Sequence, residues 1–124
     1  MQPHYSHIEQ DTLNNTNFRQ VLYTGPHMQL VVMCLKPGEE IGAEVHPDTD
    51  QFFRVEQGRA KFIIDGQEIV CSEDQVVIVP AGANHNVIND SDVDLKIYTI
   101  YTPPEHAPGT IHATKAEADA AEHH

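Results

Sequence analysis

The feature that most constrains the fold is a succession of short apolar runs that turn-forming residues interrupt. The runs are rich in Val, Ile, Phe and Tyr, which are the residues that favour β-strands. They read VLYT, MQLVVMCL, QFFRVEQ, RAKFIID, QEIVC, QVVIVP, HNVIN and LKIYTIY. The segments between them carry TGPH, KPGEE, PAGAN and NDSDVD, all of which are rich in Gly, Pro, Asn or Asp. Short strands at this spacing predict an all-β sandwich or barrel.

Two local signals refine this prediction. Asp65-Gly66 stands between two of the runs and predicts a two-residue β-hairpin, because both central positions of that turn require positive φ. Helix is predicted only near the C-terminus, where Thr114 and Glu117 have the spacing of a capping box and ADAA follows. The last element is therefore expected to be a short helix.

The first twenty residues are polar, with only Ile8, Leu13 and Phe18 available for burial. They are expected to form an arm that lies over the barrel or over a neighbouring subunit. A chain of 124 residues is the size of one ordinary domain. The predicted organisation is an N-terminal arm at 1–20, a β-barrel at 21–106 and a C-terminal tail with a short helix at 107–124.

Charge limits the classes of partner. Seven Lys and Arg residues against 19 Asp and Glu give a net charge of -12, which disfavours nucleic acid and anionic membranes as partners. The few cations are scattered and form no evident phosphate clamp. No apolar run approaches the roughly 20 residues of a membrane helix, and the N-terminus does not read as a secretory signal, so a cytoplasmic protein with a small-molecule substrate is expected.

The residues that carry chemistry cluster around two of the runs. Glu44 and His46 are two positions apart, so on a strand both side chains point to the same face. His85 follows the turn PAGAN and begins another run. The same alternation puts Gln51 and Phe53 on one face of their strand. These four polar side chains can therefore converge on one site.

Residues 38–58 and 74–89 resemble the two signature motifs of the cupin superfamily, G-x5-H-x-H-x4-E-x6-G and G-x5-P-x-G-x2-H-x3-N. Seven of the ten motif positions match. Glu44 replaces the first histidine, Gln51 replaces the glutamate, and Asp74 replaces the first glycine of the second motif. Among cupins, the chain is most similar to small single-domain proteins of the phosphomannose-isomerase-like type.

This resemblance implies a double-stranded β-helix, or jelly-roll barrel, that is usually a homodimer and holds one divalent metal near its mouth. The metal ligands of the family fall on Glu44, His46, Gln51 and His85. The exchange of ligand types is neutral in charge, because two histidines, one carboxylate and one carboxamide carry the same formal charge of -1 as three histidines and one carboxylate. Zn, Fe, Ni and Mn all suit such a set.

The candidate site residues are compatible with three functions. The first is a metal-dependent enzyme of isomerase or lyase type that acts on a small polar organic or sugar-like substrate. The second is an Fe(II) dioxygenase, because two histidines and one carboxylate form the triad of that enzyme class. The third is a non-catalytic cupin that binds a metal or a small ligand. Gln51 is either a direct ligand or a residue that orients a bound water, and Tyr98, Tyr101 and His106 are the candidate acid or base groups.

Overall fold

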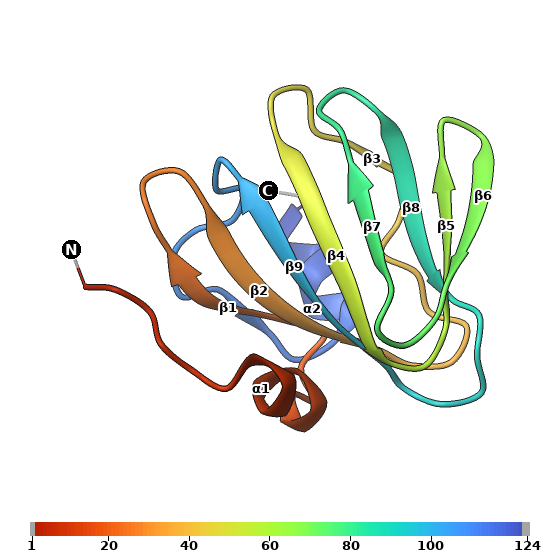
Figure 1. The fold of residues 1–124 in the computed structure, drawn as a ribbon, viewed down its shortest axis with the longest axis horizontal. Helices are drawn as coiled ribbons and strands as arrows, with labels where there is room; N and C mark the ends of the chain where they lie inside the picture. The colour runs from red at the N-terminus through yellow and green to blue at the C-terminus, as the bar shows by residue number, and fades with distance from the viewer. Residues whose placement is uncertain (1, 123–124) are drawn as a thin grey trace.

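A computed structural model describes residues 2–122 as two antiparallel β-sheets that face each other, with one short helix near each end of the chain (Figure 1). The larger sheet has the order β10-β1-β2-β9-β4-β7. Its strands are β1 (Arg19–Thr24), β2 (Gln29–Leu35), β4 (Asp50–Gln57), β7 (Val76–Val79), β9 (Leu95–Thr102) and β10 (Ile111–His112). The smaller sheet has the order β3-β8-β5-β6, with β3 (Glu44–Val45), β8 (Asn84–Asn89), β5 (Ala60–Ile64) and β6 (Gln67–Cys71). The predicted all-β jelly-roll barrel is confirmed.

The core lies between the two sheets and follows the alternation of the strands. In β4, Gln51, Phe53 and Val55 are buried, whereas the residues between them are partly exposed. The ring of Phe53 meets that of Phe62 from β5 edge to face, at 5.0 Å between centroids, which joins the two sheets. Burial of one such side chain contributes about 1.5–3 kcal/mol, so these contacts stabilise the face-to-face arrangement.

The predicted hairpin connects β5 and β6. Asp65 and Gly66 have φ values of 48° and 84°, and Ile64 is paired with Gln67 across the turn. The Asp65 carboxylate also accepts a hydrogen bond from the amide of Asn84, at 2.9 Å. The turn is therefore set by positive φ at both central positions and is tied to the start of β8.

The predicted C-terminal helix is α2 (Lys115–Glu122). The amide of Glu117 donates to Thr114 Oγ1 at 3.1 Å, and the Glu117 carboxylate accepts from the amide of Ala113 at 2.5 Å. The second bond differs from a standard capping box by one residue, but it serves the same end of the helix. The two terminal histidines, for which the sequence predicts no metal role, lie outside the described residues.

A second helix, α1 (Ile8–Asn14), lies within the N-terminal arm and was not predicted. Its sequence IEQDTLN has no pronounced apolar stripe, and tertiary contacts hold it instead. Thr12 is fully buried, and Lys96 Nζ from β9 donates to the carbonyl of Asn15 just after the helix. Figure 1 places α1 at one end of the barrel and the β3–β4 connection at the opposite end. Neither of the helices in residues 2–122 is long and apolar enough to cross a membrane.

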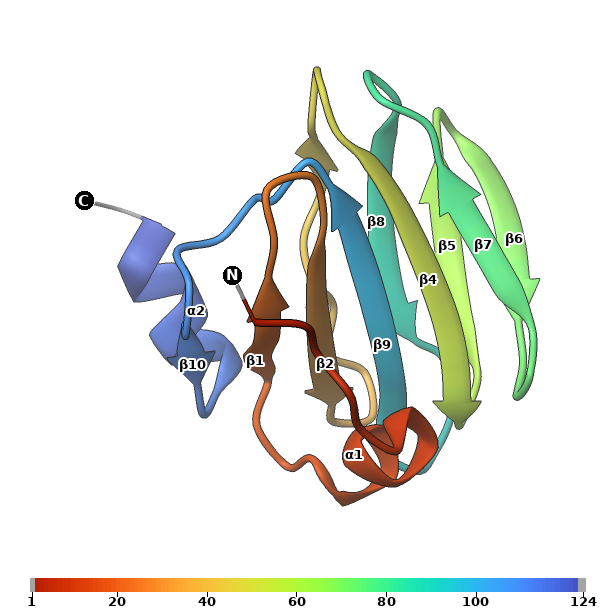
Figure 2. The ribbon, with the colours of Figure 1, turned by 60° about the vertical axis from the view of Figure 1, so that its left-hand side comes forward.

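The C-terminal tail returns to the start of the barrel. Strand β10 pairs with β1, so that Arg19 lies opposite His112. Figure 2 shows α2 beside β10, at the end of the larger sheet that is farthest from β7. Ala118 of this helix is buried and belongs to the hydrophobic core. The tail therefore covers the β1 side of the barrel.

Candidate metal centre

Three predicted site residues meet at the end of the barrel opposite α1. Glu44 and His85 are direct partners in the antiparallel β3–β8 ladder. His46 follows β3, and the exposed Val45 between it and Glu44 confirms that both side chains share the inner face. One ligand atom from each of Glu44, His46 and His85 lies within 4.8 Å of the other two. Backbone register thus brings together two segments that are far apart in sequence.

The ring of His46 is oriented by acidic groups on two sides. Its Nε2 atom lies 3.7 Å from Glu44 Oε2, and its Nδ1 atom lies 3.4 Å from Glu105 Oε1. His46 Nε2 is buried and has no hydrogen-bond partner among the described residues. Because Nδ1 is directed at the Glu105 carboxylate, Nε2 is the atom that faces the other two triad residues. Many metal-bound histidines have this arrangement.

His85 is held by its own loop. Its Nδ1 atom lies 3.3 Å from the carbonyl of Ala83, which can only accept a hydrogen bond, so in the neutral imidazole Nδ1 carries the proton and Nε2 does not. The side chain is 2% exposed, and Phe53 packs near it with 6.4 Å between ring centroids. An unprotonated nitrogen in a rigid, buried position suits a metal ligand.

Gln51 also faces the barrel interior and is 2% exposed. Its Nε2 atom donates to Thr99 Oγ1 at 3.0 Å, which fixes the orientation of the amide. The other end, Oε1, is buried without a hydrogen-bond partner among residues 2–122. Leaving such an oxygen unsatisfied costs about 1–3 kcal/mol, so Oε1 is available to a ligand.

Burial shifts the acid–base behaviour of the triad. Burial raises the pKa of the Glu44 carboxyl, while the charges of His46 and Arg19 oppose that rise. Burial also lowers the pKa of His85, and the charge of His46 adds to that effect. The neutral imidazole of His85 therefore persists to lower pH than usual, and the neutral form is the one that binds a metal.

These donors fit a divalent metal ion. They offer two imidazole nitrogens and one carboxylate oxygen, with a carboxamide oxygen on the facing sheet. Two of these atoms, His46 Nε2 and Gln51 Oε1, are buried without a partner among the described residues. Coordination of a metal ion would supply the missing partner. Such mixed nitrogen and oxygen sets serve Zn, Fe, Ni and Mn.

A second group of polar residues lies beside the triad. The ring of Tyr101 meets that of His46 edge to face at 6.0 Å, and its hydroxyl lies 3.3 Å from His106 Nε2. The buried side chain of Gln29 fixes His106, because it accepts from the His106 amide at 2.9 Å and donates to the His106 carbonyl at 2.7 Å. Tyr98, in contrast, stacks on Phe52 and is only half-buried. Only two of the three candidate acid or base groups are therefore at the site.

Sequence reasoning missed three residues near this site, namely Arg19, Glu105 and His112. Arg19 is among the largest fully buried side chains, and its Nη1 atom lies 3.3 Å from His112 Nδ1. The alternation of Arg19 with Val21 on the inner face of β1 is the one signal that could have identified it. Nothing in the local sequence around Glu105 or His112 indicates a contact with residues more than fifty positions away.

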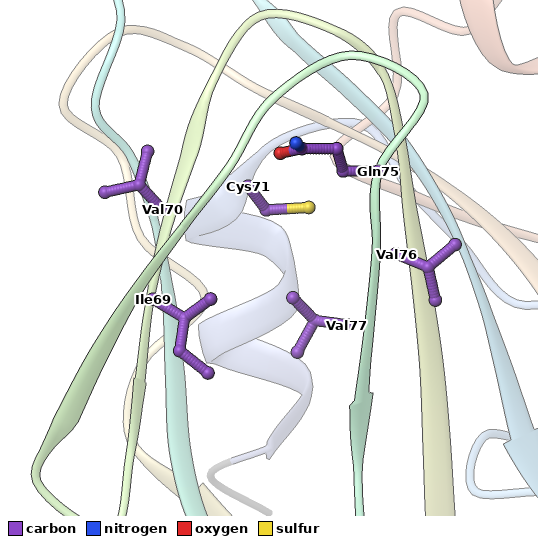
Figure 3. A pocket seen from close by; sticks show the side chains of 6 residues that line it. All are labelled: Ile69, Val70, Cys71, Gln75, Val76 and Val77. Carbon is purple, nitrogen blue, oxygen red and sulfur yellow. The ribbon is translucent and has the colours of Figure 1, made fainter.

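Two surface clefts of similar volume lie elsewhere on the described part of the molecule. One, of about 340 Å³, opens between the edge strands β6 and β7, and the side chains of Val77 and Cys71 point into it (Figure 3). The other, of about 360 Å³, lies where Pro3 and His4 of the arm meet the outer face of the larger sheet. Neither cleft is lined by a residue of the triad.

The fold and the convergent side chains define a small jelly-roll protein with a candidate His/Glu metal centre. The model of the cupin domain family matches residues 31–101, and the chain belongs to this family. An uncharacterised protein of Bacillus subtilis, YrkC, is 46% identical over 127 residues, which cover 97% of this chain and 68% of YrkC.

Two further comparisons agree. The crystal structure of BH2720 from Bacillus halodurans superposes with a TM-score of 0.94 at 42% identity, covering 96% of this chain and 95% of that one. A part of the mannose-1-phosphate guanylyltransferase of Escherichia coli is 28% identical over 76 residues, which cover 61% of this chain but 16% of that protein. The predicted membership in the cupin superfamily is thus confirmed.

Proposed function

We propose that this cupin is a metal-dependent enzyme of isomerase or lyase type that acts on a small polar organic molecule. The observation that carries the proposal is the set of convergent donors with buried, unpartnered atoms, His46 Nε2 and Gln51 Oε1. Glu44, His46 and His85 would hold one divalent ion, and Gln51 would complete the coordination or orient a water beside it. A bound ion would supply Lewis-acid polarisation of a substrate oxygen.

The acid–base pair beside the triad consists of Tyr101 and His106. The Tyr101 hydroxyl lies against His106 Nε2, and burial lowers the pKa of His106 to about 3, with the charge of Arg19 as the next cause. His106 is therefore neutral at pH 7, so Nε2 can accept the hydrogen bond of the tyrosine. We infer that the Tyr101 hydroxyl, held in place by His106, is the group that donates a proton to the substrate, because burial raises its pKa and keeps it protonated.

The test is the metal content of the purified protein after loading with Zn, Fe, Ni or Mn, measured by mass spectrometry. We expect about one ion per chain in the wild type. Glu44→Ala removes a charged ligand and should abolish stoichiometric binding. Gln51→Ala removes a neutral oxygen and should weaken the affinity less, by about 10–100-fold, which is typical of supporting groups.

Glu68→Ala is the matched control, because Glu68 is exposed on β6 and belongs to no part of the candidate site. Its metal content should equal that of the wild type. If the wild type carries no stoichiometric ion with any of the four metals, the enzyme proposal fails. The protein would then be better described as a cupin that binds a small ligand without a metal.

A second candidate function is an Fe(II) dioxygenase. The triad of two histidines and one carboxylate favours it, because that set leaves open positions on Fe(II). Oxygen uptake by the Fe(II)-loaded protein, measured with a panel of small acids and diketones, separates the two reactions. Uptake that depends on a panel member and that Glu44→Ala abolishes would favour the dioxygenase over the isomerase or lyase.

A further inference from the structure

Arg19 is a charged side chain inside the barrel that the proposed metal chemistry does not use. It lies on the inner face of β1 and is 2% exposed. Its guanidinium carbon is 5.4 Å from the centre of the Phe18 ring, and Nη1 contacts His112 Nδ1 at 3.3 Å. Neither neighbour offers a full negative charge. Burial of a guanidinium without a counterion is costly, so its position calls for an explanation.

The other two arginines differ in this respect. Arg54 lies 3.2 Å from Glu56, and Arg59 lies 3.6 Å from Asp90. Among residues 2–122, no carboxylate oxygen lies within 4.0 Å of a nitrogen of Arg19. The arginine that is most deeply buried is thus the one for which the described part of the chain supplies no anion.

The hydrogen bonds of Arg19 show which of its edges lacks a protein partner. Nη1 is directed at His112, whereas Nε is buried and has no hydrogen-bond partner among the described residues. The Nε side of a guanidinium presents two parallel N–H groups, whose spacing matches the two oxygens of a carboxylate. A carboxylate bound there would receive two hydrogen bonds and would neutralise the buried charge.

The guanidinium acts on the polar groups beside the candidate metal centre. Burial raises the pKa of Tyr101, and the Arg19 charge is the largest effect that opposes it. Burial lowers the pKa of His106, and the Arg19 charge is the second cause. The charge of Arg19 therefore acts on Tyr101 and His106, and the Tyr101 ring in turn lies 6.0 Å from that of His46 in the triad.

We propose that Arg19 binds the carboxylate of a small organic acid whose other polar end lies at Glu44, His46 and His85. This inference rests on the proposed function and names its substrate class. A phosphate ester fits less well, because it would bring about two negative charges to a single guanidinium in a chain whose net charge is -12. The ligand is a monocarboxylate at this position, with a hydroxyl or carbonyl at the opposite end.

The test follows the Nε–H resonances of the arginines by proton–nitrogen NMR while acetate is added. The chain has three arginines, so three signals are expected, and Arg54→Lys and Arg59→Lys assign them. Acetate is the smallest fragment common to these acids, and it is titrated to about 100 mM because fragments bind weakly. Acetamide, which has the same shape without the charge, and inorganic phosphate are titrated in parallel at constant ionic strength.

We expect acetate to shift the Arg19 signal saturably, with little change from acetamide and no saturable change at Arg54 or Arg59. Acetate should also raise Tm. In Arg19→Gln, the affinity for acetate that this rise in Tm reports should fall by about tenfold or more. Arg54→Gln should leave this affinity unchanged. A stronger response to phosphate than to acetate would overturn the carboxylate assignment. Absence of any saturable shift at Arg19 would overturn anion binding altogether.

The titration is performed on both the metal-free and the zinc-loaded protein, which separates the two proposals. A response of Arg19 to acetate without stoichiometric zinc binding would refute the metal centre and leave the anion site standing. Zinc binding without a response of Arg19 would refute the anion site alone. Retention of zinc by Arg19→Gln would show that the variant is folded around an intact triad.

Discussion

At the scale of single residues, the register between β3 and β8 decides the geometry of the candidate centre. Glu44 and His85 are cross-strand partners, so the spacing of the ladder sets the separation of their backbones. A slip of one residue would bring Val45 to the inner face and turn Glu44 outward, because side chains alternate along a strand. Two of the candidate ligands thus depend on a pairing that covers only two residues of β3.

The stability of the protein should depend on pH through His106. Its folded-state pKa of about 3 lies below the ordinary value of 6.5, so the unfolded chain binds the proton more readily. The contribution of neutral His106 is fully present above pH 6.5 and is lost as the pH falls toward 3. The unfolding free energy that His106 contributes changes by at most about 1.4 kcal/mol per pH unit. His106→Gln, which cannot titrate, should therefore lose about 2 kcal/mol less stability between pH 6.5 and 4.5.

Urea unfolding at several pH values measures this difference. His27→Gln is the control, because His27 is exposed, and its curve should follow that of the wild type. Parallel curves for His106→Gln and the wild type would contradict the expected role of His106.

The sequence predicted the triad but not the residues around it. Parity along a strand places Glu44 with His46, and the motif spacing adds His85, so these three side chains follow from local information. The contact of Arg19 with His112 joins residues 93 positions apart, and it arises from the β1–β10 pairing. A two-residue strand such as β10 leaves no recognisable pattern in the sequence, so that contact could not be predicted.

At the scale of elements, the β5–β6 hairpin depends on its turn. Gly66 has a φ of 84°, and a Cβ atom placed there would meet no heavy atom within 4 Å. Gly66→Ala should therefore cost about 1–2 kcal/mol of unfolding free energy through backbone conformation alone, without a steric clash. Chemical denaturation measures this loss of unfolding free energy.

Gln67→Ala, at the adjacent exposed position, should change the unfolding free energy by less than about 0.5 kcal/mol. If Gly66→Ala proves as stable as the control, the left-handed conformation of the turn is not a requirement of the hairpin.

The strands could be predicted from the sequence because their pattern of apolar residues is local. The apolar runs predicted strands because β-branched and aromatic side chains alternate in them, and each of the eight runs overlaps a strand of the structure. The helix α1 has little pattern of its own and depends on contacts with β9 and β4. Such a helix cannot be read from a single sequence, because tertiary packing supplies most of its stability.

At the scale of the whole molecule, an apolar row crosses the outer face of the larger sheet. Leu30 pairs with Ile100, which pairs with Phe52, which in turn pairs with Ile78. Ile78 is 62% exposed, and the other three are half-buried. We propose that this face forms the interface of a homodimer, because association would remove a continuous apolar row from water.

Light scattering coupled to size-exclusion chromatography should then give twice the chain mass of 13.9 kDa. Ile78→Glu places a charge at the exposed end of the row and should yield the monomer. Val70→Glu, which alters a valine that is 55% exposed on β6 in the other sheet, should remain dimeric. A wild type that elutes as a monomer at micromolar concentration would refute the proposed interface.

The small size of β3 has a consequence for how long a metal ion would stay bound. Two of the three triad residues lie in or just after this strand, which ends the smaller sheet and, within residues 2–122, pairs only with β8. Local opening of such an edge breaks few hydrogen bonds and leaves the core between the sheets intact. The residence time of an ion would therefore be set by the opening rate of residues 44–46, and the ion could exchange while the barrel stays folded.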